Sequence, residues 1–277
     1  MAGRRQNMRR QPGLAASAAA LVRHHLEGEK DMIDLAATTY LHIGLDEAGW
    51  LHFAAGTEYS APALRRAADM ADVLREPAAA MPEDVLYRMY RDVRRAGDGP
   101  RIEAAGLRFD LTVLRPGSVG REAVKTYGHY HPARSGGGGT YPEIYEVIHG
   151  AAQYLLQKPG EAWDTIADVV LVAAAAGDKV IIPPGYGHVT VNPGDDYLVM
   201  ANLVARGFAS DYAPYRQLRG AAWYVLADGT TVPNGQYSAV APLRRAAAGE
   251  MPLLGVPRDV PLYRVLPECP ESLAFLV

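Results

Sequence analysis

Between about residue 101 and residue 232 the sequence breaks into short apolar or alternating runs, and most of them end at a glycine or proline turn. The clearest run is Leu107–Leu114, where apolar and polar side chains largely alternate. The other runs cover residues 143–148, 151–157, 168–173, 179–182, 189–191 and 197–204. Period-two alternation is typical of half-buried strands, and many short strands separated by turns are typical of a β-sandwich or small barrel. The chain is therefore predicted to be mainly β.

The composition changes along the chain and suggests four parts. Residues 1–12 hold four arginines and predict a disordered basic arm. Residues 13–100 contain most of the helix-like sequence, so we expect an N-terminal extension with helices. Residues 101–232 form the barrel, and residues 233–277, which are rich in proline, form a C-terminal extension.

Local patterns make the N-terminal extension more specific. Residues 61–74 place apolar side chains near helical spacing. An acidic start at residues 82–84, followed by apolar residues up to 90, predicts a second helix. Residues 41–53 predict two short strands around a turn.

Charge, cysteine count and hydropathy exclude several classes of protein. The formal net charge is −3, which offers no electrostatic footprint for nucleic acid. No apolar run reaches the ~18–20 residues of a membrane helix. The single cysteine, Cys269, excludes an internal disulfide framework and fits a reducing compartment. We expect a cytoplasmic protein that binds a small molecule, with neither nucleic acid nor a membrane as partner.

One set of residues carries the chemistry of a metal site. His129 and His131 are two positions apart, and such side chains face the same side of a strand. Glu143 begins the next run beyond a glycine-rich loop, and His188 follows a proline turn. Three imidazoles and one carboxylate suit iron(II), manganese, nickel or zinc. Glu146, three residues beyond Glu143, should face the opposite side of its strand.

Several neighbouring residues are predicted to lie outside this site. A lone histidine is more often a core or surface residue than a ligand, and His149 is expected at the surface beside a turn. Tyr130, between two of the histidines, should point away from the metal. Arg115 and Lys125 are expected to be solvated. The metal prediction therefore depends on the whole set of four residues.

The two runs that contain these ligands resemble the two sequence motifs of the cupin superfamily. Residues 177–192 match the second motif, whereas eleven residues separate His131 from Glu143 in the first, where a shorter spacer is usual. The longer spacer resembles the cupin-type phosphoglucose isomerases. Their segments are also similar, in order, to residues 64–70, 112–120, 125–131, 143–150, 183–192 and 207–208. The resemblance covers roughly residues 60–235 and implies a single cupin barrel, a jelly-roll or double-stranded β-helix.

This resemblance implies an enzyme that interconverts glucose-6-phosphate and fructose-6-phosphate, a step of glycolysis and gluconeogenesis. It implies one divalent metal ion per subunit, with iron(II) the first expectation. The metal ligands would be His129, His131, Glu143 and His188. The sugar phosphate would be held by Thr112, Thr126, Gly128 and Tyr145, and the catalytic residues would be Glu143 and Tyr145. We also expect a homodimer, because C2 association is the commonest way to cover apolar strands and terminal arms.

Two positions depart from the family pattern. Val204 and Ser210 stand where the family often has a tyrosine and a histidine. Other functions therefore stay open: another metal-dependent cupin, such as a different sugar isomerase or an oxygenase, or a non-catalytic sugar-binding cupin. Two routes also stay open for an isomerase, namely proton transfer through a cis-enediol and a metal-assisted hydride shift.

Overall fold

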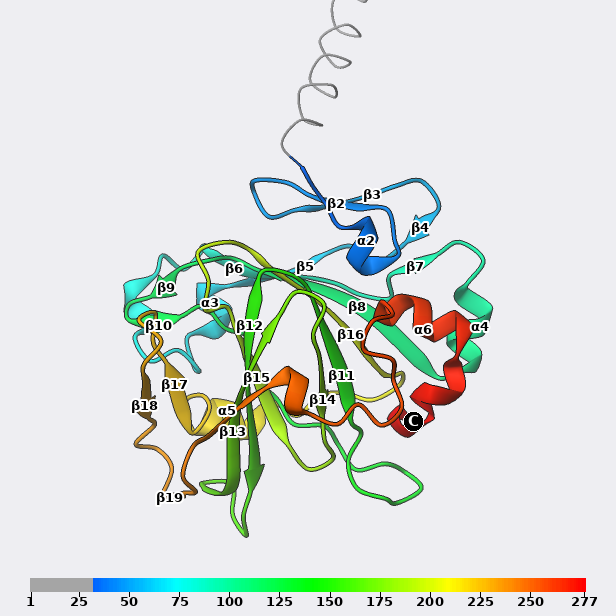
Figure 1. The fold of residues 1–277 in the computed structure, drawn as a ribbon. Coiled ribbons are helices and arrows are strands. Elements are labelled where there is room, and N and C mark those ends of the chain that lie inside the picture. The colour runs from blue at the N-terminus through cyan, green and yellow to red at the C-terminus, as the bar shows by residue number, and fades with distance from the viewer. Residues whose placement is uncertain (1–31) are drawn as a thin grey trace, which may run out of the picture.

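The computed structural model describes residues 32–277, so the arm predicted at residues 1–12 lies outside the described residues. Two sheets form the body of the molecule (Figure 1). The larger sheet has the order β14-β11-β16-β8-β6-β5, with strands Lys179–Ile182, Glu143–His149, Leu198–Ala205, Leu107–Leu114, Val85–Tyr90 and Ala63–Arg66. The smaller sheet has the order β15-β12-β13-β19, with β20 also pairing with β13, and its strands are Gly187–Val191, Ala151–Pro159, Thr165–Ala175, Ala239–Val240 and Arg244–Ala247.

The chain crosses repeatedly between the two sheets. β11 lies in the larger sheet, β12 and β13 in the smaller, β14 in the larger, β15 in the smaller and β16 in the larger. Gly150 makes the first of these turns with a φ of +80°, and a Cβ there would lie 2.7 Å from the carbonyl oxygen of Tyr197. This path is that of a double-stranded β-helix, so the predicted mainly β cupin barrel is confirmed.

The remaining elements are short. Two-stranded or three-stranded additions are β1 Ile33–Asp34, β2 Ile43–Leu45, β3 Leu51–Phe53, β4 Thr57–Glu58, β7 Arg94–Arg95, β9 Ser118–Val119, β10 Glu122–Ala123, β17 Trp223–Val225 and β18 Thr231–Pro233. The α-helices are α2 Ala36–Thr39, α3 Ala67–Met70, α4 Gly99–Ala104, α5 Ala213–Gln217 and α6 Leu262–Glu268. Within residues 32–277 no helix is long and apolar enough to cross a membrane.

The helices expected before residue 100 are largely wrong. Residues 85–90 are the strand β6, and only Ala67–Met70 of the segment 61–74 is α-helical, after the strand β5. Tyr87 faces the interior between the sheets, whereas Tyr90 is buried on the other face of β6. Burial on both faces abolishes the alternation that marks a half-buried strand, and the resulting spacing imitates a helix. The pair of strands expected within residues 41–53 is confirmed as β2 and β3.

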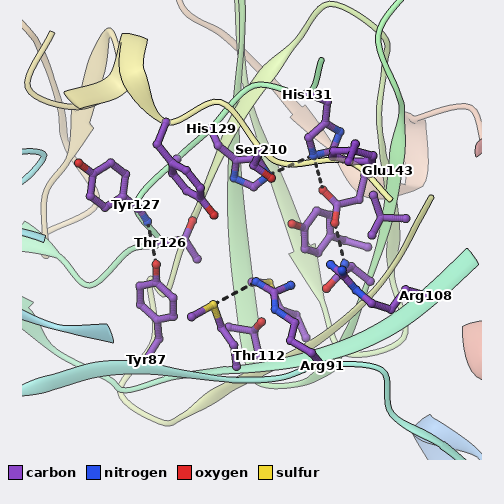
Figure 2. Close-up of a pocket in the computed structure, with 18 of the residues that line it drawn as sticks. Tyr87, Arg91, Arg108, Thr112, Thr126, Tyr127, His129, His131, Glu143 and Ser210 are labelled. Atoms are coloured by element: carbon purple, nitrogen blue, oxygen red, sulfur yellow. Dashed lines mark hydrogen bonds and ion pairs between the residues drawn. The ribbon is translucent and has the colours of Figure 1, made fainter. Parts of the chain in front are cut away.

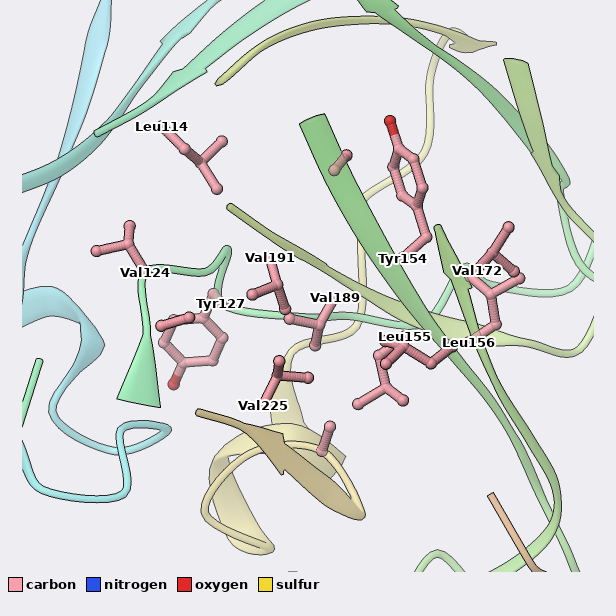
Figure 3. Packing of buried hydrophobic residues seen from close by; sticks show 14 of the residues in the cluster. Leu114, Val124, Tyr127, Tyr154, Leu155, Leu156, Val172, Val189, Val191 and Val225 are labelled. Atoms are coloured by element: carbon pink, nitrogen blue, oxygen red, sulfur yellow. The ribbon is translucent and has the colours of Figure 1, made fainter. Parts of the chain in front are cut away.

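Two hydrophobic cores lie on opposite faces of the larger sheet. One fills the space between the two sheets and contains Leu114, Tyr154 and Val189 (Figure 3). The other lies on the outer face of the larger sheet, where α6, at the red end of the chain in Figure 1, and the N-terminal strands cover it. The C-terminal extension thus packs on its own barrel. The division of the chain at residues 101 and 233 stays a prediction.

Candidate metal centre and active-site pocket

Three adjacent strands of the larger sheet supply one wall of a pocket. Because alternate residues of a strand share a face, the register of β8, β16 and β11 lines up their inward side chains in rows across the sheet. The rows are Arg108–Val204–Glu143, Asp110–Asn202–Tyr145 and, beginning on β6, Met89–Thr112–Met200. The pocket is completed by the segment around residues 126–131 and by residues 208–212.

The structure brings together the four predicted metal ligands (Figure 2). His129 and His131 are not in a regular strand; an isolated bridge pairs His129 with His188 instead. The Nε2 atoms of His129 and His131 are 3.1 Å apart. Oε2 of Glu143 lies 3.4 Å from Nε2 of His131 and 3.2 Å from Nε2 of His188. All four candidate ligand atoms lie within 4.8 Å of one another.

The chemistry of this donor set fits a metal ion. Nδ1 of His131 donates to the carbonyl of Tyr141 at 2.9 Å, which leaves its Nε2 lone pair facing the cluster. Nδ2 of Asn202 donates to Oε1 of Glu143 at 2.7 Å, and Oε2 is buried with no hydrogen-bond partner among residues 32–277. A buried carboxylate oxygen left unpaired beside converging ring nitrogens is costly unless a cation completes the site. The buried group of three histidines and Glu143 could therefore bind a metal.

Electrostatics keep His129, His131 and Glu143 in the forms that bind metals. Burial, and then the nearby charges of His188 and His131, lower the pKa of His129 well below its usual value. Burial also lowers the pKa of His131, although Glu143 opposes the shift. Burial alone would raise the pKa of Glu143, but the adjacent His188 and the charges of His131 and Arg91 together outweigh it, so the pKa is lowered. Neutral imidazoles and an ionised carboxylate are the states that metal binding requires.

The residues expected to lie off the site do so. Oε1 of Glu146 pairs with Nζ of Lys179 at 2.9 Å on the opposite face of β11. Nε2 of Gln157 donates to the hydroxyl of Tyr130 at 2.8 Å, away from the metal ligands. Nε2 of His149 lies 2.9 Å from Asp196 near the surface.

One end of the pocket offers uncharged donors. Thr112, Thr126 and Gly128 line it together with Tyr87, whose pKa burial raises to about 12, so its hydroxyl keeps its proton. The backbone N–H of Tyr127 donates to the Tyr87 hydroxyl at 3.3 Å. The backbone N–H of Thr190 likewise donates to Oγ1 of Thr126. Because each hydroxyl oxygen accepts one of these bonds, the hydroxyl protons of Tyr87 and Thr126 can both donate to a ligand.

Gly128 is required for a reason that the sequence did not reveal. Its φ is +84°, and a Cβ would lie 2.6 Å from Cγ2 of Val189 and 2.7 Å from the ring of Tyr215. The glycine therefore allows close packing beneath the pocket floor as well as an unusual backbone conformation.

Tyr145 lines the pocket beside the metal ligands. Its hydroxyl is 3.1 Å from Nε2 of His188. Burial, and then the charge of Glu143, raise the pKa of Tyr145 well above its usual value, so it is a protonated donor or acceptor at neutral pH.

Sequence reasoning missed the arginines of this pocket. Arg91 and Arg108 both line it, and both contact the buried carboxylate of Asp110. Arg91 follows a strand that was predicted to be a helix, and its meeting with Arg108 depends on strand pairing. The alternation of Arg108, Asp110 and Thr112 along β8 was the available signal.

The two basic residues predicted to be solvated behave differently. Lys125 is buried; its Nζ lies 2.6 Å from Glu122 and donates to the carbonyl of Val73 at 2.7 Å. That expectation is therefore wrong for Lys125. Arg115 is partly buried and donates to the carbonyls of its own loop, at Pro116 and Ser118, outside the pocket.

Both departures from the family pattern line the pocket. Val204 pairs in register with Glu143, and Ser210 lies near His129 in Figure 2. These two positions therefore face whatever the pocket binds.

The similarity to known proteins extends over the whole barrel. The family model described as "Glucose-6-phosphate isomerase (GPI)" matches residues 64–241. A glucose-6-phosphate isomerase of Thermococcus onnurineus is 32% identical over 152 residues, 54% of this chain and 70% of that protein. One of Pyrococcus horikoshii is 32% identical over 132 residues, 47% and 60% of the two chains. A putative glucose-6-phosphate isomerase 1 of Rhizobium meliloti is 31% identical over 173 residues, 60% and 72% of the two chains.

Among solved structures, the likeness is weaker. Oxalate decarboxylase from Bacillus subtilis superimposes with a TM-score of 0.33 and 19% identity, over 45% of this chain and 27% of that one. A TM-score this low carries no argument about function. The family model, in contrast, matches residues 64–241, more than half of the chain, and the chain belongs to the cupin-type glucose-6-phosphate isomerase family.

Proposed function

We propose that this chain interconverts glucose-6-phosphate and fructose-6-phosphate at a divalent metal ion held by His129, His131, Glu143 and His188. The observation that carries the proposal is the buried four-ligand cluster, which opens onto a pocket with hydroxyl and amide donors at its far end. Iron(II) is the first candidate, and manganese, nickel and zinc suit the same donor set. The membership of the isomerase family supplies the substrate class.

In this proposal the phosphate lies at the end of the pocket with uncharged donors. Thr112, Thr126, the Gly128 amide and the Tyr87 hydroxyl are the donors available there. Arg65 adds positive charge behind them: it pairs in register with Tyr87 and lowers that residue's pKa against the effect of burial. Hydroxyl and amide donors can bind a phosphate without a glycine-rich P-loop.

The sugar's C1 and C2 would then face the metal ligands. A bound metal would supply Lewis-acid polarisation of the sugar oxygens. Glu143 is the carboxylate that lines the pocket among residues 32–277, and its lowered pKa keeps it ionised, as a base for proton transfer requires. The Tyr145 hydroxyl, beside His188, can donate to a sugar oxygen. Both the enediol route and the hydride shift need this positioning.

A coupled assay tests this proposal. The purified chain should convert glucose-6-phosphate, lose the activity in a chelator, and recover it when iron(II) or manganese(II) is returned. Free glucose should be turned over poorly. Oxygen consumption without isomerisation would support the oxygenase alternative, and sugar-phosphate binding without turnover would support the non-catalytic one.

The cellular setting and assembly complete the proposal. A cytoplasmic location follows from a glycolytic substrate, and fractionation of cells checks it. A homodimer is supported by the general frequency of C2 association. The outer face of the larger sheet is already covered by α6 and the strands β2 and β3, so the dimer contact would use another surface. A monomeric mass by light scattering at micromolar concentration would contradict the dimer.

A further inference from the structure

A short hairpin, residues 132–141, connects two of the metal ligands and is hereafter the ligand hairpin. An isolated bridge pairs Ala133 with Thr140 near its base. Its tip consists of four consecutive glycines, residues 136–139, and glycine loses more conformational freedom on folding than any other residue. A two-stranded hairpin is at best marginally stable by itself. The ligand hairpin therefore needs contacts with the rest of the molecule to keep its shape.

The ligand hairpin contacts the surroundings of two metal-binding histidines. The carbonyl of Tyr141 accepts a hydrogen bond from Nδ1 of His131 at 2.9 Å, which fixes the ring nitrogen that faces the metal centre. Oγ1 of Thr140 accepts a hydrogen bond from the backbone N–H of Gly185 at 2.7 Å. Gly185 lies in the turn three residues before His188. The hairpin thus links histidines that are far apart in the sequence.

Arg134 ties the ligand hairpin to the C-terminal extension. Its Nη1 donates to the backbone oxygen of Val277, marked C in Figure 1, at 2.8 Å, and its Nη2 donates to that of Phe275 at 2.6 Å. Leu273 and Leu276 anchor this segment, because both are fully buried in the core on the outer face of the larger sheet. A planar guanidinium that donates two bonds at once is held in a fixed orientation. The hairpin is therefore tied to a firmly packed part of the chain.

We propose that Arg134 and Thr140 are positioning residues of the metal centre, through which the C-terminal extension slows the release of the metal. Both lie outside the pocket lining, so they act through the ligand hairpin and not by contact with the substrate. Release requires a ligand ring to turn away, and the hairpin opposes that turn at His131 and His188. This inference rests on the metal site of the proposed function, but not on the identity of the substrate.

Transfer of zinc from the loaded chain to a chromogenic chelator measures the release rate. Arg134→Gln removes the guanidinium that holds the C-terminal extension, and Thr140→Val replaces the acceptor hydroxyl by a methyl group of similar size. Each change should speed up release by about ten-fold, the lower end of the effect expected for residues that orient metal ligands. Thr140→Ser keeps the acceptor oxygen and should restore the wild-type rate.

Arg101→Gln is the matched control. Arg101 also donates to a carbonyl of the C-terminal extension, that of Pro267 at 3.3 Å, but it lies on α4 and not on the ligand hairpin. Urea denaturation of each chelated variant measures the stability of the fold, and release is measured well below the denaturation midpoint. A merely structural role would shift the midpoint and leave the release rate unchanged, which would overturn the inference. Equally fast release from Arg101→Gln would overturn it as well.

Hydrogen exchange of the chelated chain tests the coupling without a metal. The backbone N–H of Tyr141 donates to the carbonyl of Pro132, and that of Gly185 donates to Thr140. Arg134→Gln should make both amide hydrogens exchange faster than in the wild-type chain, because the hairpin opens more often. Unchanged exchange at Gly185 would show that the turn before the third histidine does not depend on this anchor, and would overturn the inference.

The proposed isomerase function is judged separately by turnover of glucose-6-phosphate. A chain that isomerises the sugar but releases zinc at the same rate in every variant keeps the function and removes the inference. Faster release from both Arg134→Gln and Thr140→Val in a chain without isomerase activity keeps the inference and removes the function.

Discussion

The two faces of the larger sheet are made by alternate residues of the same strands, and they serve different purposes. On β8 the outer positions Phe109, Leu111 and Val113 are apolar and fully buried. The inner positions between them include Thr112, which lines the pocket, and Asp110, which pairs with the pocket residues Arg91 and Arg108. The outer face buries apolar area against α6 and the N-terminal strands, whereas on the inner face polar side chains occupy buried positions. Residues that stabilise the fold and residues that serve the pocket therefore alternate along the same strand.

The strand β11 gives the sharpest form of this contrast. Glu143 and Glu146 are both buried glutamates on one strand, three residues apart. Glu143 faces the metal ligands, whereas Glu146 pairs with Lys179 and accepts a hydrogen bond from the backbone N–H of Leu262, at the start of α6. The same residue type therefore lies among the metal ligands on one face of the strand and binds the C-terminal extension on the other.

The largest effect is expected for Glu143→Gln. This change removes a negative ligand from the cluster while keeping the shape of the side chain. We expect isomerase activity to fall by about 10³-fold or more, as when a group that stabilises transition-state charge is lost. Activity is measured in the coupled assay and bound metal by elemental analysis. Full metal content together with full activity would show that Glu143 is not a ligand.

Glu146→Gln is the matched substitution on the other face. It leaves the ammonium group of Lys179 buried without its partner, which typically costs about 3–5 kcal/mol of stability. We expect urea denaturation to show this loss, and the turnover rate, measured well below the melting temperature, to stay near that of the wild type. A variant with normal stability and no activity would reverse the assignment of the two faces.

The metal ligands could be predicted from sequence because local rules place them. His129 and His131 are two residues apart, and the turn before His188 is marked by prolines. The pocket arginines could not be predicted in this way. Tyr87 faces inward from β6, while Arg88 stacks on Trp50 and Tyr90 is buried on the other side, so no alternation marks the strand. Arg91 and Arg108 meet only through pairing of β6 with β8.

Thr126→Ala probes the uncharged end of the pocket. Losing a hydroxyl that donates to a phosphate should cost about 1–3 kcal/mol, so we expect the KM for glucose-6-phosphate to rise about ten-fold. Metal content should not change. Thr126→Ser keeps the hydroxyl and should restore most of the affinity. If Thr126→Ala leaves KM unchanged, the phosphate does not bind at this end.

The smallest expected effect is a pH dependence of stability that arises from two histidines of the pocket, His129 and His131. In the chelated chain the pKa values of His129 and His131 lie below the usual 6.5, so the folded state keeps both rings neutral while the unfolded state takes up protons near pH 6.5. The free energy of unfolding should therefore be highest above pH 6.5 and should fall as the pH drops below it. Each histidine contributes up to about 1.4 kcal/mol per pH unit. Urea denaturation in a chelator between pH 7.5 and 5.5 measures the slope, which His129→Asn should reduce. A slope that is the same in His129→Asn as in the wild-type chain would mean that this ring is not held neutral by the fold.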